Sequence, residues 1–323
     1  MNLRRVQETG GTFLVSLPRA WAKRGGLTKG SILAMVERQD GCLVIDPQYK
    51  FEKSVEVATI SASQYVEREI TGKYLLGFDT IKIEGQNRLP ANMSEKVRGT
   101  VRRLIGLEIV EEDAHIITLQ CLLDPSSFPP EKILRREHLF ASSMHRDALT
   151  AFMEEDVPLA KDIVERDDEV DRLYFLIVRL LRTAILNLGL SEKMGLSTID
   201  CLDYRLAASH IESIGDYACE VARSIIEFVG TPLPKEILQP VCRLGELSYE
   251  MHQNAIQAIF SKSLDLVGKV SEASLTSKEI IRQFDEFLAK EPSRVISYAS
   301  AVASALNRIC SYSIDLADLV MPR

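Results

Sequence analysis

No apolar run of about 18 residues occurs in this chain of 323 residues, so the sequence contains no candidate for a membrane-spanning helix. The opening residues, MNLRRVQETGG, are not followed by an apolar stretch of the secretory type, and we expect no export signal. With 46% hydrophobic and 26% charged residues, the composition is that of a soluble globular protein. We therefore expect a cytoplasmic protein.

Signatures of common enzyme classes are also missing. The chain has no GxxxxGK[ST] or GxGxxG loop, no HExxH motif and no Ser-His-Asp pattern. Its cysteines form no CxxC pair, which is typical of reduced, buried thiols and not of a disulfide framework or a zinc site; they are Cys42, Cys121, Cys201, Cys219, Cys242 and Cys310. We predict that the protein is not an enzyme. A metallophosphatase that uses a carboxylate site is the enzymatic alternative.

Charge is distributed unevenly along the chain. Residues 1–50 contain eight Lys and Arg against four Asp and Glu, a net charge of +4. The whole chain carries −7, so the remainder carries −11. A basic end on an acidic protein is a common layout for a nucleic-acid-binding part attached to a larger body.

The length predicts more than one domain, and the residue pattern changes twice along the chain. Residues 1–50 alternate around a Gly-Gly pair and a short PRAWAKRGG helix, which predicts a small β domain. So small a sheet cannot bury enough apolar surface alone, and we expect a homodimer through this domain. Residues 51–128 alternate strand-like and helix-like stretches, which predicts a small α/β connector domain.

We predict a helical domain over 129–323. Apolar residues recur at helical spacing with few glycines from residue 133 to residue 323, after a Pro- and Ser-rich stretch at 124–132 that is a plausible linker. This region repeats itself: residues 144–171 align without gaps on 251–278, and residues 211–222 align on 306–317. We predict two tandem bundles of about three helices each, over 133–230 and 235–323.

The alignment of the two repeats also pairs two histidines. His145 and His252 take equivalent positions, near the start of a helix in our prediction, which implies a structural role. His210 precedes Glu212 by two residues and faces elsewhere on its helix.

Two pairs of acidic residues recur at helical spacing. Glu212 and Asp216 lie four residues apart in HIESIGDYACEVA, and Asp167 and Asp171 repeat the spacing in ERDDEVDRLY. Like charges at this spacing destabilise a helix by a few tenths of a kcal/mol. If the two helices pack side by side, the four carboxylates could converge on a multivalent cation, for which oxygen ligands suit Mg, Ca, Mn or iron. Spacing alone equally fits a solvated acidic face.

The helical region resembles the PhoU family of phosphate-uptake regulators, and the IGDYA context and the repeat carry this resemblance together with the acidic motifs. The resemblance implies repeated three-helix bundles whose Glu/Asp-x-x-x-Asp motifs bind multinuclear metal clusters. It assigns metal ligation to Asp167, Asp171, Glu212 and Asp216, with iron, Mn, Mg or Zn as the ion.

The second repeat departs from this motif. Asn307 and Ser311 stand where the first repeat has Glu212 and Asp216, and Ser274 and Lys278 replace Asp167 and Asp171. A protonated lysine cannot ligate a cation. We therefore expect one cluster, in the first repeat. Beside it, Glu220 could supply a further oxygen and Arg223 could compete with the metal for a carboxylate.

The N-terminal region resembles the SpoVT/AbrB-type DNA-binding domain, a swapped-hairpin β dimer, over RRVQETGGTFLVSLPRAWAKRGGLTKGSILAMV. The resemblance implies that basic side chains meet DNA phosphates; they are Arg4, Arg5, Arg19, Lys23 and Arg24. Alternatively, the region only dimerises the protein and these residues keep it soluble. Gly10, Gly11 and Thr12 stand where related DNA binders often place an arginine.

Together these resemblances predict a regulator of phosphate uptake that binds promoter DNA through its head and a metal through its helical body. The resemblance also implies partners, namely a phosphate ABC transporter ATPase or a signalling kinase. The alternative is an adaptor that docks on such a partner without binding DNA. For residues 51–128 we can suggest only a spacer or a small-ligand function.

Overall fold

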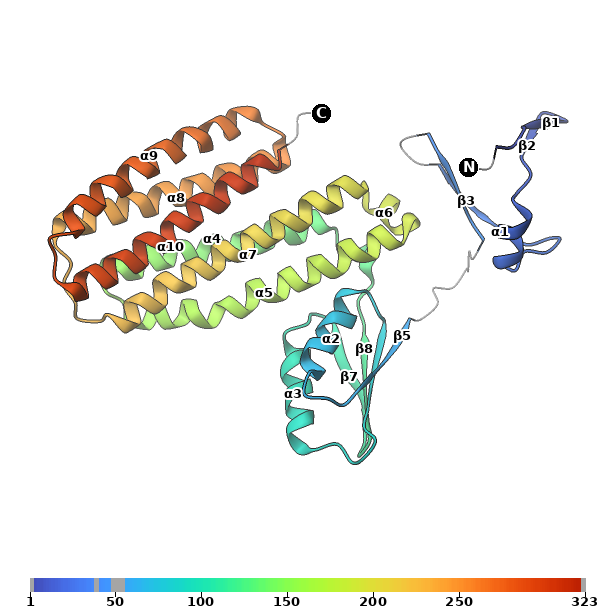
Figure 1. The fold of residues 1–323 in the computed structure, drawn as a ribbon, viewed down its shortest axis with the longest axis horizontal. Coiled ribbons are helices and arrows are strands. Elements are labelled where there is room, and N and C mark those ends of the chain that lie inside the picture. The colour runs from blue at the N-terminus through green and yellow to red at the C-terminus, as the bar shows by residue number, and fades with distance from the viewer. Residues whose placement is uncertain (1–2, 38–40, 48–55, 321–323) are drawn as a thin grey trace. The chain divides into compact units, whose positions relative to one another are not determined.

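The structure, a computed structural model, describes residues 3–37, 41–47 and 56–320. The chain forms two compact units, Met1–Val55 and Glu56–Arg323 (Figure 1). Each unit is described by itself below.

The first unit consists of two hairpins and a short helix. Strands β1 (Gln7–Thr9) and β2 (Thr12–Leu14) pair antiparallel, and β3 (Ala34–Glu37) pairs antiparallel with β4 (Leu43–Asp46). Gly10 and Gly11 close the first hairpin with φ angles of 58° and 78°, which glycine adopts without steric cost. Helix α1 is Arg19–Arg24, within the predicted PRAWAKRGG segment. The sequence also predicts an Asp-Gly turn at residues 40–41, and Asp40 lies outside the described residues.

None of the side chains described in this unit is buried. Many large apolar side chains are exposed; they are Leu3, Val6, Phe13, Leu14, Val15, Ile32, Met35 and Leu43. Cys42 is exposed as well, so the prediction that every cysteine packs in a core is wrong for this one. The described residues of a single copy therefore form no buried hydrophobic core. Pairing of the hairpins between two chains remains a prediction.

An α/β module opens the second unit, with strands and helices in the predicted order. Its sheet has the order β5-β6-β8-β7, in which only β5 and β6 are parallel, and side chains of helices α2 and α3 share one hydrophobic core with it (Figure 1). The elements are β5 (Val57–Ser61), α2 (Val66–Leu75), β6 (Thr80–Glu84), α3 (Ala91–Arg102), β7 (Leu107–Glu112) and β8 (Ile116–Cys121).

Two helical bundles follow, which confirms the prediction of tandem bundles. The first contains α4 (Pro130–Glu154), α5 (Val157–Leu186) and α7 (Thr198–Glu227), with the short α6 (Leu188–Met194) between the last two. The second contains α8 (Lys235–Ser261), α9 (Leu264–Leu288) and α10 (Ser293–Asp318). One hydrophobic core runs through both bundles. No helix in the described ranges reaches the length and apolarity that crossing a bilayer requires.

Helix α4 begins inside the stretch that the sequence suggests as a linker. A single 3-10 turn at Pro125–Ser127 precedes it, and Pro130 opens the helix. A proline at the first helical position needs no N–H bond and has its φ preset for a helix. The Pro-rich composition therefore marks a helix start here, and the predicted linker is too long.

The two repeats correspond in detail. The first helix of each ends in a left-handed residue, Glu155 with φ 53° and Lys262 with φ 54°, and these positions are 107 residues apart, as in the sequence alignment. His145 and His252 share that spacing, but they lie buried in the middle of α4 and α8. The prediction that they lie near helix starts is wrong because both helices begin well before them.

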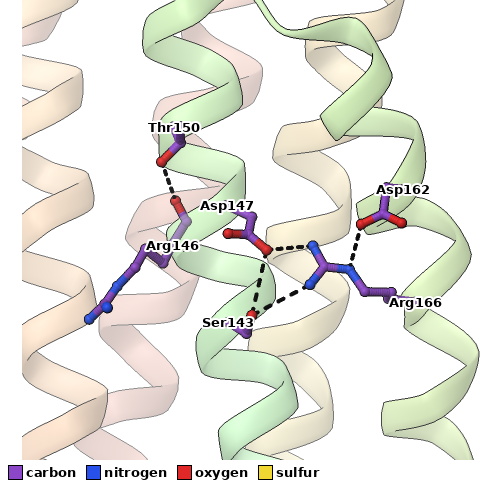
Figure 2. A network of polar contacts seen from close by, with 6 residues as sticks. All are labelled: Ser143, Arg146, Asp147, Thr150, Asp162 and Arg166. Atoms are coloured by element: carbon purple, nitrogen blue, oxygen red, sulfur yellow. Dashed lines mark hydrogen bonds and ion pairs between the residues drawn. The ribbon is translucent and has the colours of Figure 1, made fainter.

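An ion-pair network ties α4 to α5 (Figure 2). Arg166 on α5 pairs with Asp147 on α4 at 2.6 Å and with Asp162 on its own helix at 3.0 Å. Figure 2 shows Arg146 pointing away from this network. Both acids here are therefore neutralised by an arginine.

The α/β module packs on α5 around a buried arginine. Arg179 is 2% exposed and donates hydrogen bonds to the carbonyls of Tyr74 at 2.6 Å, Phe78 at 3.0 Å and Gly77 at 3.2 Å. These carbonyls end helix α2, so the guanidinium caps that helix from the neighbouring bundle. Phe175 of α5 adds an apolar contact with the core of the module.

Candidate metal centre

Helices α5 and α7 approach closely beside the acidic residues. Gly215 on α7 is buried, and a Cβ atom built at this position would lie 3.4 Å from Val170 on α5. The missing side chain lets the two helices pack tightly at this level. Asp171 follows Val170, while Glu212 and Asp216 flank Gly215, so the contact brings acids from both helices together.

Three of the four predicted ligands form a cluster. Carboxylate oxygens of Asp171, Glu212 and Asp216 all lie within 4.8 Å of one another. Among the described residues, this is the only group of three or more acidic, histidine or cysteine side chains at such distances. Charges of one sign this close repel strongly when partly removed from water.

Burial and the repulsion between the acids together raise the pKa values of the cluster. Burial raises the pKa of Glu212 to about 7, with further contributions from Asp216, Asp171 and Asp167. Burial likewise raises the pKa of Asp216 to about 6, with Asp167 and Asp171 adding to the effect. Without a cation, the cluster therefore holds protons near neutral pH that an ordinary exposed carboxylate would have lost.

Asp167, the fourth predicted ligand, lies one turn from Asp171 on α5 and does not belong to the group of three. Burial raises its pKa, and the charge of Asp171 raises it further, while Arg223 lowers it. Arg223 lies 3.7 Å from Asp167, where it can compete with a cation for this carboxylate. The sequence suggests this competition through the position of Arg223 on α7.

A second arginine reaches the cluster from the α/β module. Arg103 follows α3 and pairs with Asp171 at 2.8 Å. A carboxylate has two oxygens, so Asp171 can hold this pair and still offer one oxygen to a cation. This contact could not be predicted from the sequence, because the two residues are 68 positions apart, one in the α/β module and one in the first helical bundle.

Glu137 on α4 is the functional candidate that the sequence analysis missed. It is fully buried, and neither of its carboxylate oxygens has a hydrogen-bond partner. Burial raises its pKa well above the ordinary value, and the charges of Glu212 and Asp171 raise it further, whereas Arg205 lowers it. A buried carboxyl group with neither oxygen paired is unfavourable unless something else compensates. In the sequence Glu137 lies far from the paired acidic motifs. The only signal there is an acidic residue among the apolar positions of a predicted helix.

These residues fit a hard multivalent cation. All donors are carboxylate oxygens, and the group of three comes from α5 and α7. Glu137 of α4 has two unpaired oxygens, and the charges of Glu212 and Asp171 raise its pKa. Oxygen-only sites suit Mg²⁺, Ca²⁺ and Mn²⁺, and carboxylate-rich sites in helical bundles also hold iron. Such an ion would convert the mutual repulsion of the acids into ligation.

The neighbouring positions differ from this cluster. Glu220 is exposed one turn beyond Asp216 and lies outside the group of three. In the second repeat, Lys278 is exposed, and the Ser311 hydroxyl donates to the backbone carbonyl of Asn307 at 3.1 Å. These side chains offer no comparable set of oxygen ligands.

The predicted DNA-contacting residues all belong to the first unit. Two of them precede β1 and three lie in α1, and all five side chains are exposed; they are Arg4, Arg5, Arg19, Lys23 and Arg24. Their exposure leaves them accessible to an anionic partner and equally to solvent.

Comparisons with known proteins agree on the helical part. Residues 134–225 match the family described as "PhoU domain". A phosphate-specific transport system accessory protein PhoU homolog from Pseudomonas aeruginosa is 27% identical over 205 residues, which are 58% of this chain and 80% of that protein. The crystal structure of PhoU from Pseudomonas aeruginosa matches with a TM-score of 0.53 and 20% identity, covering 59% of this chain and 93% of the other, which supports the fold. The first helical bundle thus contains a region that matches the PhoU domain, and the helical part has the fold of the solved PhoU structure.

Proposed function

We propose that this chain is a cytoplasmic, non-enzymatic regulator of a phosphate transport system. Its first helical bundle contains one site for a multivalent cation. The ligands are Asp171, Glu212 and Asp216. Glu137 of α4 and Asp167 of α5 are further candidate ligands. The observation that carries the proposal is the convergence of three carboxylates within 4.8 Å next to a fourth that is buried and unpaired.

The regulatory part of the proposal rests on the relatives. The Pseudomonas aeruginosa relative is an accessory protein of a phosphate-specific transport system, and by analogy this chain acts on a transporter or on a kinase that reports phosphate status. A bound cation would bias the bundle between two states by ligating Asp171 and weakening its pair with Arg103. The α/β module would then be held less firmly when the cation is present.

Phosphate uptake in a strain that lacks the gene tests this proposal. The proposal expects uptake that no longer responds to external phosphate, restored by the wild-type chain and not by Glu212→Gln/Asp216→Asn. Glu272→Gln, an exposed acid on α9, is the matched control and should restore regulation. Normal regulation in the deletion strain would contradict the regulatory role, and full complementation by the double variant would contradict the role of the metal.

For the first unit we propose pairing with a second copy and contact with DNA phosphates through Arg4, Arg5, Arg19, Lys23 and Arg24. The exposed apolar side chains of the hairpins supply the reason for pairing, since a second copy can cover them. Two copies also double the exposed positive charge available to DNA.

Binding to the DNA upstream of its own gene at several salt concentrations separates this proposal from a pure adaptor. Five basic contacts per subunit predict affinity that falls steeply as salt rises, and substitution of Lys23 and Arg24 by Gln should flatten the slope. No binding, or a slope that does not depend on salt, would favour the adaptor that docks on a transporter ATPase or kinase.

A further inference from the structure

A groove opens between α4 and α8, where the first helices of the two repeats run side by side. Its volume is about 750 Å³, which lies within the range of about 300–1,000 Å³ that small-molecule sites occupy. The lining includes Arg135, His138, Arg146, Tyr249, Gln253 and Phe260. None of these residues belongs to the proposed cation site.

The packing of the two helices explains why the groove exists. A Cβ atom built on Gly245 of α8 would lie only 2.3 Å from the Leu149 side chain of α4, so the helices are in direct contact there. The groove lies along the same pair of helices beside Arg135 and Phe260, where larger side chains face each other. It is therefore a feature of the repeat interface.

The groove is electropositive. Two arginines line it and no carboxylate does, although the chain as a whole carries a net charge of −7. Burial lowers the pKa of His138 to about 4, so this histidine adds no charge near neutral pH. Arg146 lies over the Tyr249 ring at 4.6 Å and donates to its hydroxyl. In the part of the chain that the structure describes, no acid forms an ion pair with Arg146. Arg135 lies over Phe260 at 3.6 Å and pairs with Glu131, which lies outside the lining.

The two arginines set the length of a suitable ligand. They are eleven residues apart on one helix, which corresponds to about 16 Å between their backbone positions. A single phosphate cannot contact both guanidinium groups over that distance unless the side chains converge fully. A ligand of nucleotide size, with its phosphoryl groups at one arginine and the rest of its length toward the other, matches the groove.

Three buried histidines form a chain of hydrogen bonds, and one of them, His138, lines the groove. Ser248 donates its one hydroxyl hydrogen to the Gly245 carbonyl at 2.8 Å, so it must accept from Nε2 of His145 at 3.3 Å. His145 Nδ1 then accepts from His252 Nε2 at 3.1 Å, and His252 Nδ1 accepts from His138 Nε2 at 3.0 Å. With neutral rings, this order leaves Nδ1 of His138 as a hydrogen-bond acceptor, and His138 is one of the residues that line the groove. A hydroxyl group of a ligand can donate to this nitrogen.

We propose that this groove binds a phosphorylated, hydroxyl-bearing small molecule of nucleotide size, held by Arg146 through its phosphoryl groups, by Arg135 at its opposite end and by His138 through a hydroxyl group. Charge-assisted bonds from a guanidinium to phosphoryl oxygens supply affinity. The aromatic rings of Tyr249 and Phe260 hold the two guanidinium groups in place.

Calorimetric titration of the full-length protein in chelator-containing buffer tests the proposal, with ADP, adenosine, tripolyphosphate and inorganic phosphate as probes. The proposal expects ADP to bind, adenosine not to bind measurably, and the two inorganic probes to bind more weakly than ADP. Arg146→Gln and Arg135→Gln should each weaken ADP binding about tenfold or more, as the loss of a charge-assisted bond predicts. Arg282→Gln, an exposed arginine on α9, is the matched control and should leave binding unchanged.

Three results would overturn the proposal: no binding of ADP, equal affinity for ADP and adenosine, or equal affinity of the wild type and both groove variants for ADP. Inorganic phosphate binding as tightly as ADP would overturn the assignment of an elongated ligand. Thermal melting followed by circular dichroism shows whether each variant is folded. Arg146→Lys, which keeps the positive charge, should retain more affinity than Arg146→Gln.

Discussion

Glu137 shows how strongly one buried acid can depend on its surroundings. Its carboxyl group is fully buried with both oxygens unpaired, and burial together with Glu212 raises its pKa well above the ordinary value. In the protein without a cation this group therefore stays protonated, and folding bears the cost of the missing hydrogen bonds. Ligation of a cation would remove that cost. The acidic pairs could be predicted from their spacing, whereas Glu137 could not, because only packing brings it to them.

Replacement of Glu137 by Gln tests this residue. The amide keeps the shape of the side chain without a titrating group, so the cation-free protein should keep its free energy of unfolding within about 1 kcal/mol or gain slightly. Metal retention on the folded protein, measured by elemental analysis, should fall. Glu131→Gln, at an exposed position on the same helix, should change neither quantity. Unchanged metal retention in Glu137→Gln would contradict a ligand role.

The buried His145 predicts an acid-sensitive stability. Burial lowers its pKa to about 3, whereas an exposed histidine in the unfolded chain titrates near 6.5. Below pH 6.5 the unfolded chain takes up a proton that the folded protein does not, so the free energy of unfolding falls as the pH falls toward 3. The slope from this one residue is at most about 1.4 kcal/mol per pH unit.

Denaturant unfolding of the wild type and of His145→Gln between pH 8 and pH 4 measures this contribution. The groups facing His145 are His252, Ser248 and Tyr249, and only His252 titrates in the same direction, since its pKa is also lowered by burial. The variant should show a flatter dependence on pH. His115→Gln, an exposed histidine, should keep the wild-type slope, and an unchanged slope in His145→Gln would contradict the assignment.

At the scale of helices and strands, the two repeats could be predicted from the sequence. Apolar residues recur at helical spacing, and the alignment of 144–171 on 251–278 has no gaps. The helix ends at Glu155 and Lys262 could not be predicted. Both residues adopt the left-handed backbone conformation that usually marks a glycine at a helix end. The groove between α4 and α8 also escaped prediction, because it depends on which helices of the two repeats pack together. Gly245 is the residue that permits this contact.

Substitution of Gly245 by Ala should destabilise the protein by about 1–3 kcal/mol, because the new methyl group overlaps the Leu149 side chain. Gly268 on α9 is the matched control, since a Cβ atom there meets no atom within 4 Å. Gly268→Ala should be neutral or stabilise by up to about 1 kcal/mol through its higher helix propensity. Chemical denaturation measures both, and equal effects of the two substitutions would contradict the packing argument.

At the scale of the whole molecule, composition and periodicity predicted the order of a β head, an α/β module and helical bundles. They could not predict that the α/β module packs on α5, because this contact rests on one arginine inside a run of apolar helix residues. Arg179 is bonded to three carbonyls of the module, and Arg103 of the module reaches Asp171 in the acidic cluster. One of the contacts that hold the module therefore involves an acid of the cluster, and the proposed cation would bind next to this contact.

Replacement of Arg179 by Met should loosen the module from the bundles at a cost of about 1–3 kcal/mol, since the carbonyls of Tyr74, Gly77 and Phe78 lose the hydrogen bonds from the guanidinium. Hydrogen exchange should then accelerate in residues 66–78 while α8 and α9 keep their protection. Arg182→Met, an exposed arginine on the same helix, is the control and should exchange like the wild type. Equal protection of residues 66–78 in Arg179→Met and the wild type would show that this arginine does not hold the module.

The central claim is that carboxylates from neighbouring helices converge because a cation binds among them. Elemental analysis of the purified wild type, Glu212→Ala/Asp216→Ala and the exposed control Glu272→Ala tests it most directly. The account predicts that the wild type and the control retain a multivalent metal after dialysis, whereas the double variant loses most of it. Equal metal content in all three proteins, or none in the wild type after loading with Mn²⁺, Mg²⁺ or iron, would contradict the account.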